Sequence, residues 1–358
     1  MTHSWTALAD NAARDVNDRF GHRLMGLPGT WIGALRAPVP IPKAPAARGR
    51  RIRGDAPWSE WHYWWQAHYL DAIVDMGFHY VRAGAPEAAK AEVRRGLRLL
   101  RGIKIRNFGV FPNYFFDDMA WLALSSHRLN ALCLELHQQP AKLAQSAVDS
   151  LTRQLRSGQD SVLGGGLYWS RKRAFKNVPV NGPAALHFAR IGDRETAREL
   201  VEWMRDKLFD PVLGLYLDGI YLVNAGHRLG GQIYTYNQGP VLGAWLELGD
   251  EKYLRHAAEL IDAIDSRLTA PQQGLRLEQG GDGSLFTGIL CRYLTMAAVD
   301  PRLPTSTRDS AERMVLETAQ IVAHAQNLQL SAAVQRWSIF CAAAVIEGNQ
   351  RRAEAEEA

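Results

Sequence analysis

Apolar residues recur along most of the chain at the spacing of an α-helix, which turns one face inward every three or four residues. The pattern predicts twelve helices. Their approximate bounds are 4–20, 59–83, 86–103, 113–138, 140–156, 178–191, 193–208, 235–248, 250–267, 282–298, 305–326 and 329–347. No strand-like alternation is strong enough to predict a sheet, although short hairpins are expected near GGGLYWS and GLYLDGIY.

The predicted helices fall into pairs of contrasting character. One member is amphipathic and charged, as in EAAKAEVRRGLRLLRGI and DEKYLRHAAELIDAI, and such a helix exposes one face to water. The partner is apolar nearly all round, as in NGPAALHFARI and YNQGPVLGAWLEL, and such a helix is covered on most sides. This alternation of outer and inner helices predicts an all-α fold, a closed double ring called the (α/α)6 barrel.

The length of 358 residues suits one large domain. We expect a single domain over residues 1–348, followed by a flexible C-terminal tail at 349–358. Residues 26–57 form a Pro/Arg-rich loop, and their proline content predicts an extended path over the surface. The hydrophobic fraction of 47% and the charged fraction of 22% are typical of a soluble globular protein.

The net charge of +5 is mildly basic, and the basic residues are dispersed apart from one run at Arg48 to Arg53. No recognition motif accompanies that run, so we expect no nucleic-acid partner. No apolar run approaches membrane-spanning length, and the N-terminus lacks the pattern of a secretory signal. We therefore expect a cytoplasmic monomer without membrane insertion.

The three cysteines, Cys133, Cys291 and Cys341, are far apart and each lies in an apolar helical context. An odd number without CxxC spacing argues against disulfides or a zinc site and favours buried free thiols. The histidines lack the HxxxH spacing of a metal-binding helix. A metal site is therefore only weakly indicated, and the sequence contains no P-loop, no GxGxxG after a strand and no GxSxG elbow.

The stretch FPNYFFDDMAWLAL places two adjacent carboxylates, Asp117 and Asp118, among aromatic residues. Each charge disfavours ionisation of its neighbour, and apolar surroundings disfavour the charged form of both. One carboxylate can then stay ionised while the other keeps its proton, which is the division of roles that glycoside hydrolysis requires. The alternative is a pair of favourable first-turn acids, but the flanking aromatic residues favour catalysis.

The position of the pair matters, because successive residues on a helix point about 100° apart. Pro112 and Asn113 predict a helix start just before the two acids, since Pro favours the first turn and Asn can cap it. Near such a start both carboxylates can reach one cavity.

Further aromatic and polar residues gather in the glycine-rich loops and the apolar helices. Tryptophan can stack on a sugar face, and amides or carboxylates can hydrogen-bond sugar hydroxyls. The candidates for substrate binding are Trp65, Gln66, His68, Trp121, Trp169, Asn177, Asn181, Asp218, Tyr236, Asn237, Gln238, Phe286 and Arg292. Other roles stay open: either Asn of the 177/181 pair can cap a helix, Asp218 can be a turn residue, and His68 can be a hydrogen-bonded core residue. Arg292 is also expected to pair with a carboxylate.

Five segments together resemble glycoside hydrolase family 76, the endo-α-1,6-mannanases, over roughly residues 58–298. They are YWWQAHYLDAIVD, YFFDDMAWLALS, GGGLYWSRKRAFKNVPVNGPAAL, YTYNQGPVLGAWLEL with the upstream LDGI, and LFTGILCRYL. The resemblance implies an (α/α)6 barrel that hydrolyses α-1,6-mannosidic bonds with retention and needs no metal or organic cofactor. The implied partner is α-mannan or a manno-oligosaccharide substrate.

The resemblance also implies roles for individual residues. Asp117 matches the family's nucleophile, and Asp118 matches its general acid/base. The positions that match cleft-lining residues of the family are Trp169, Asn177, Asn181, Asp218, Tyr236, Asn237 and Gln238.

The leading hypothesis is therefore a retaining, endo-acting α-mannan hydrolase. A transglycosylase would use the same two acids, with an acceptor sugar in place of water. A sugar isomerase or epimerase on the same barrel depends on paired histidines, for which the sequence offers few candidates. A non-catalytic glycan-binding protein would gain nothing from two crowded acids.

Overall fold

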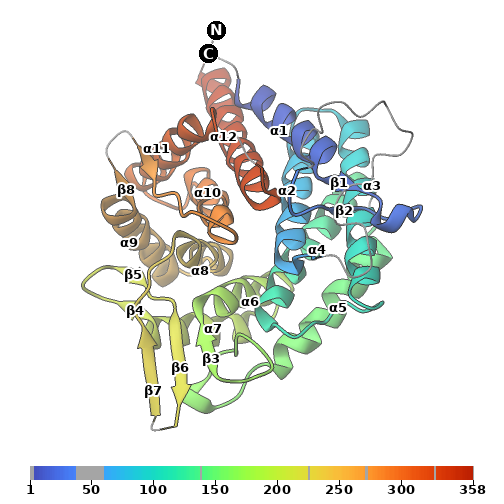
Figure 1. Cartoon of the computed structure of the whole chain (residues 1–358). Helices are drawn as coiled ribbons and strands as arrows, with labels where there is room; N and C mark the ends of the chain where they lie inside the picture. The colour runs from blue at the N-terminus through green and yellow to red at the C-terminus, as the bar shows by residue number, and fades with distance from the viewer. Residues whose placement is uncertain are drawn as a thin grey trace.

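A computed structural model describes residues 4–37, 60–137, 139–224, 226–270, 273–325 and 328–357. Within these residues twelve α-helices form two concentric rings, so the fold is the expected (α/α)6 barrel (Figure 1). The inner ring consists of α2 (Tyr63–Arg82), α4 (Phe116–His137), α6 (Val178–Arg190), α8 (Thr235–Leu248), α10 (Gly283–Ala298) and α12 (Leu330–Glu357). The outer helices are α1 (Trp5–Arg19), α3 (Pro86–Arg106), α5 (Lys142–Ser157), α7 (Arg194–Lys207), α9 (Glu251–Leu268) and α11 (Thr305–Val322).

Each inner helix packs against the next, and α12 packs against α2, which closes the ring. The predicted contrast between inner and outer helices is present in the burial of their side chains. Every residue of α6 from Val178 to Ala189 is buried, whereas α5 buries a single stripe. The inner helices are therefore the core, and the outer helices shield it from water.

The strands are short and lie in the connections that precede inner helices. They are β1 (Gly21–His22), β2 (Ile32–Gly33), β3 (Phe175–Asn177), β4 (Phe209–Asp210), β5 (Leu215–Tyr216), β6 (Gly219–Val223), β7 (Gly226–Gly230), β8 (Thr269–Ala270) and β9 (Gly274–Leu275). Short 3₁₀ turns, η1 (Leu24–Gly26) and η2 (Val162–Gly164), occur in the same kind of connection. Strands β3, β6 and β7 form an antiparallel sheet whose hairpin projects from one rim of the barrel (Figure 1).

Part of the Pro/Arg-rich loop differs from the expectation of a surface path. Ile32 and Gly33 are buried in β2, where the Gln66 side chain bonds both the N–H and the C=O of Gly33 at 2.8 and 2.9 Å. Gly102 allows this approach, because a Cβ there would lie 2.0 Å from the carbonyl oxygen of Trp31. Residues 38–57 of the loop lie outside the described residues.

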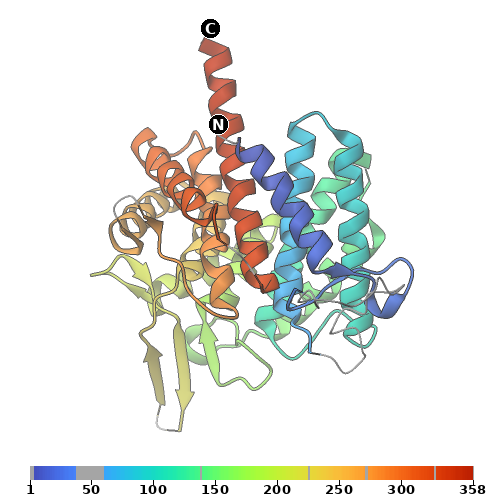
Figure 2. The ribbon, with the colours of Figure 1, turned by 45° about the horizontal axis from the view of Figure 1, so that its top comes forward.

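The C-terminal tail also differs from the expectation, because residues 349–357 continue α12 as a regular helix that projects beyond the rings (Figure 2). Its flexibility stays a prediction. All three cysteines are free and buried, as predicted. None of the described helices is both long and apolar enough to cross a membrane.

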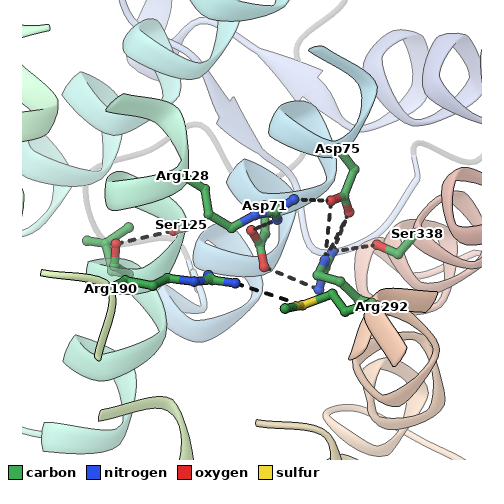
Figure 3. Close-up of polar contacts among 9 residues, drawn as sticks. Asp71, Asp75, Ser125, Arg128, Arg190, Arg292 and Ser338 are labelled. Carbon is green, nitrogen blue, oxygen red and sulfur yellow. Dashed lines mark hydrogen bonds and ion pairs between the residues drawn. The ribbon is translucent and has the colours of Figure 1, made fainter. Parts of the chain in front are cut away.

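A buried network of ion pairs joins three inner helices (Figure 3). Arg128 of α4 and Arg292 of α10 both bind Asp71 and Asp75 of α2, with Arg292 Nη2 2.6 Å from Asp75 and Nη1 3.2 Å from Asp71. Burial would raise the pKa of Asp71, but the charges of Arg128 and Arg292 overcome it and hold the pKa below its ordinary value. The network therefore ties α2, α4 and α10 together while each charge is neutralised.

We expect Asp71→Asn to lower the free energy of unfolding by about 3–5 kcal/mol, because it leaves two buried guanidinium groups with one carboxylate. Chemical denaturation at neutral pH measures this loss. The matched control is Asp309→Asn, at an exposed position of α11, which should change stability by less than about 0.5 kcal/mol. A similar small change in both variants would contradict the stabilising role of the network.

Candidate active site

The two adjacent acids lie in the first turn of α4, directly after Phe116. Asn113 shapes this turn, because its Oδ1 accepts from the N–H of Phe115 at 2.9 Å. Its Nδ2 donates to Asp118 Oδ2 at 2.6 Å. Asn113 thus connects the chain that enters the helix to one of the two carboxylates.

Asp117 is held by two tryptophans from different parts of the fold. The indole Nε1 of Trp121, one turn along α4, donates to Asp117 Oδ1 at 2.9 Å. The indole Nε1 of Trp169, in the loop before β3, donates to Oδ2 at 3.1 Å. The N–H of Asp117 also donates to the carbonyl of Trp169 at 3.2 Å, which joins this loop to the start of α4.

The environments of the two acids raise their pKa values unequally. Burial raises the pKa of Asp117 to about 7, although the hydrogen bonds from Trp121 and Trp169 favour its charged form. Burial and the charge of Asp117 raise the pKa of Asp118 to about 8. Asp117 therefore ionises first, and Asp118 keeps its proton to higher pH.

Both acids line one cavity of about 290 Å³, so the adjacent side chains share a hollow. The other residues that line this central cavity are His62, Trp64, Phe115, Trp169, Tyr236, Asp282 and Phe286. Most of them lie at or just before the N-terminal ends of α2, α4, α8 and α10, which meet at this rim of the barrel. Helix N-termini carry partial positive charge, which favours carboxylates here.

The central cavity continues into larger hollows on both sides. One, of about 520 Å³, shares His62, Phe115 and Asp118 with it. The other, of about 700 Å³, shares Trp169, Tyr236 and Phe286 and reaches the β3–β6–β7 sheet. The two acids thus line a groove made of the central cavity and the two hollows that share lining residues with it.

Five of the residues singled out in the sequence for substrate binding line this groove. They are Trp169, Asn177, Asp218, Tyr236 and Phe286. The rings of Tyr236 and Phe286 stack with centroids 3.8 Å apart. Burial raises the pKa of Asp218 to about 6, while Nδ2 of Asn237 donates to it at 3.4 Å. The groove therefore combines aromatic surfaces with carboxylate and amide groups.

Other candidates support the groove from behind. The indole of Trp65 donates to Asp282 Oδ1 at 2.6 Å, and Trp121 holds Asp117. His68 is buried with its ring centroid 4.4 Å from that of Trp64 and 4.8 Å from that of Trp121. Burial lowers the pKa of His68 well below its ordinary value, so this ring packs as a neutral group. Its Nε2 has no hydrogen-bond partner among the described residues.

The remaining candidates bond the scaffold or lie elsewhere. The amide of Asn181 bonds Leu167 and Asn177 backbone groups, and that of Gln238 bonds Tyr216 and Tyr234 backbone groups. Gln66 bonds Gly33 in the same way. Arg292 does pair with carboxylates, as expected, but these are Asp71 and Asp75 rather than the acids of the groove.

The candidate list from the sequence missed four residues of the central cavity, His62, Trp64, Phe115 and Asp282. The Nε2 of His62 lies 3.3 Å from Asp282 Oδ1, so this carboxylate has a histidine and a tryptophan as neighbours. The available signal was position: His62, Phe115 and Asp282 each directly precede an inner helix, and Trp64 lies in the first turn of α2, as the two acids lie in the first turn of α4. In the described part of the chain, no group of three or more His, Cys, Asp or Glu residues forms a candidate metal site.

The model of glycosyl hydrolase family 76 matches residues 45–339. This chain belongs to glycosyl hydrolase family 76. A comparison with curated proteins gave no significant match.

Solved structures of the family resemble the whole chain. The α-1,6-mannanase GH76A from Salegentibacter sp. HEL1_6 is 26% identical with a TM-score of 0.79, over 96% of this chain and 100% of that one. An inactive variant of it, with two adjacent aspartates replaced by asparagine, was solved with α-1,6-mannotriose and has a TM-score of 0.80, at the same identity and coverage. The fold is shared by the family 76 mannosidase Bt3792 from Bacteroides thetaiotaomicron VPI-5482. That protein is 15% identical to this chain, with a TM-score of 0.68 over 98% of this chain and 99% of that one.

The raised pKa values predict how stability changes with pH. A carboxyl whose pKa rises from 3.8 to about 7 or 8 on folding stabilises the folded state at low pH. This contribution is lost as the pH rises through the folded values. As the pH rises from 4 to 9, the Tm of the double variant Asp117→Asn/Asp118→Asn should therefore increase relative to the Tm of the wild type, by about 2 °C or more.

Thermal unfolding at a series of pH values measures this difference. Asp309→Asn serves as the control, because its exposed carboxyl should give a curve parallel to that of the wild type. Parallel curves for the double variant and the wild type would show that burial does not penalise the ionised pair.

Proposed function

We propose that this family 76 glycoside hydrolase cleaves α-1,6-mannosidic bonds within mannan chains, with retention at the anomeric carbon. The observation that carries the proposal is the pair of adjacent acids in one cavity, with pKa values raised to about 7 and about 8. The related α-1,6-mannanase is inactive when two adjacent aspartates are replaced and is then found with α-1,6-mannotriose. Asp117 and Asp118 are the adjacent pair that this chain offers to a sugar.

Asp117 is suited to be the nucleophile. Two indole N–H groups favour its carboxylate form and hold it in one orientation. In the first step the carboxylate attacks the anomeric carbon and forms a covalent glycosyl-enzyme. The hydrogen bonds from Trp121 and Trp169 keep the attacking oxygens directed into the cavity.

Asp118 is suited to be the general acid and base. Its higher pKa, caused by burial and by the charge of Asp117, keeps it protonated when Asp117 is ionised. It gives this proton to the departing glycosidic oxygen as the bond breaks. The resulting carboxylate then takes a proton from water, whose oxygen displaces Asp117 and releases the sugar with its original configuration.

Endo action is supported by the shape of the groove. Hollows of about 520 Å³ and 700 Å³ extend from either side of the central cavity. A chain bound across the two acids would therefore have sugar residues on both sides of the bond to be broken. Trp169, Tyr236 and Phe286 offer aromatic surfaces on one of these sides.

We expect the protein to degrade linear α-1,6-mannan to oligosaccharides of intermediate size, and Asp117→Asn to lose on the order of 10⁴-fold of this activity or more. Product sizing shows whether bonds within the chain are cleaved. NMR analysis of the anomers shows whether the configuration at the anomeric carbon is retained. β-1,4-Mannan and α-1,4-glucan serve as linkage controls. Inversion at the anomeric carbon, or full activity in Asp117→Asn, would reject the assigned roles. Longer products with excess acceptor would instead indicate a transglycosylase.

The two acids are distinguished by an aryl α-mannoside whose leaving group needs no proton. With this substrate, Asp118→Asn should still form the glycosyl-enzyme, and it should accumulate because deprotonation of water is slow. Asp117→Asn should form none. Mass spectrometry of the intact protein detects the adduct, and an adduct that also forms in Asp117→Asn would place the nucleophile elsewhere.

The pKa values further predict a bell-shaped dependence of kcat/KM on pH, with apparent values near 7 and 8 that belong to the coupled pair. Activity is lost at low pH when Asp117 is protonated, and at high pH when Asp118 is ionised. Trp121→Phe removes a hydrogen bond to the carboxylate form of Asp117, so the acid limb should move to higher pH. The control is Trp203→Phe, because the indole N–H of Trp203 donates to the carbonyl of Leu163. This variant should leave both limbs of the pH profile in place.

A further inference from the structure

A second cavity, of about 320 Å³, lies at the end of the barrel away from the two acids. It is lined from the C-terminal halves of α2, α4, α6 and α10 and from the middle of α12, whereas the acids lie at the start of α4. Its volume corresponds to about ten water molecules at roughly 30 Å³ each. The space is thus large enough for a small organic molecule.

Positive charge dominates the wall of this distal cavity. Four arginines, Arg82, Arg128, Arg190 and Arg292, line it against one carboxylate, that of Asp75. Arg128 and Arg292 are neutralised by Asp75 and by Asp71 behind it (Figure 3). Among the described residues, Asp71 and Asp75 form ion pairs with Arg128 and Arg292 but none with Arg82 or Arg190.

Arg190 has weak partners for a largely buried guanidinium. Its Nε lies 3.4 Å from Glu247, and its side chain is 14% exposed. On the cavity side, Nη2 meets only the sulfur of Met296 at 3.9 Å among the described residues (Figure 3). Because sulfur is a poor acceptor, this contact leaves the N–H groups of Arg190 Nη2 able to donate to a ligand in the cavity.

Arg82 is exposed at the end of α2, and no described carboxylate forms an ion pair with it. Asp75 attracts it but is already bonded to both arginines of the network. The C-terminal ends of the inner helices favour cations at this end of the barrel. That effect accounts for the presence of arginines but does not satisfy their remaining N–H groups.

We propose that the distal cavity binds a small phosphorylated molecule, whose phosphate is bound by arginines of the cavity wall, Arg82 and Arg190 among them. Guanidinium groups bind phosphate oxygens through paired, charge-assisted hydrogen bonds. Apolar side chains complete the wall and leave room for an organic body; they include Phe78, Met296, Val299 and Val345. This site is separate from the catalytic groove, and it does not depend on the function proposed for that groove.

Isothermal titration calorimetry at low ionic strength tests the site with inorganic phosphate and with mannose 6-phosphate. Both should bind the wild type, and Arg190→Gln and Arg82→Gln should each weaken binding at least about tenfold, the loss of one charge-assisted contact. Tighter binding of mannose 6-phosphate would assign the site to a sugar phosphate. Equal affinities would assign it to free phosphate, and both results support the anion site.

Two controls separate this result from other causes. Arg94→Gln, on the exposed face of α3, removes the same charge far from the cavity and should bind phosphate as the wild type does. The Asp117→Asn variant should also bind normally, so a failure of the catalytic proposal leaves this test intact. Unchanged melting temperature in Arg82→Gln shows that its loss of binding is not misfolding.

The proposal would be overturned if neither phosphate bound the wild type. It would also be overturned if Arg190→Gln and Arg82→Gln bound phosphate as tightly as Arg94→Gln, because the anion would then lie elsewhere. Any response to unphosphorylated mannose in the catalytic groove is recognised by its independence of Arg190.

Discussion

Closure of six inner helices into one ring is the constraint on which the groove with the two acids depends. Because these helices start at the same rim, residues far apart in the sequence meet there, among them His62, Asp117, Tyr236 and Asp282. Helix N-termini favour their carboxylates, while the aromatic walls disfavour ionisation. Burial raises the pKa of Asp117 to about 7 although two indole N–H groups favour its charged form, so the removal of water has a larger effect than these hydrogen bonds.

The groove then makes two chemically identical acids different. Asp117 receives indole N–H groups from its own helix and from the loop before β3, whereas Asp118 receives one amide N–H from Asn113. The extra donor favours the charged form of Asp117, and that charge in turn favours the protonated form of Asp118. Trp169 therefore contributes to this division from a loop outside α4.

The same ring gathers the opposite ends of the inner helices, and the chemistry there has the opposite sign. Asp71 and Asp75 neutralise Arg128 and Arg292 in a network that joins α2, α4 and α10. Arg190 faces the adjacent cavity with donor capacity to spare. One architecture thus gathers carboxylates near the helix starts at one end and a mixed set of guanidinium and carboxylate groups at the other.

The sequence by itself determined the helices, their inner or outer character and the adjacent pair of acids in its aromatic surroundings, because periodicity and adjacency are local properties. The family segments located Trp169, Asp218 and Tyr236 as well. Tertiary structure alone decided that Gln66 bonds a backbone strand while Asp282 faces the groove. An apolar helix with a few polar residues looks the same in sequence whether those residues satisfy the scaffold or face a ligand, because the partners come from distant segments.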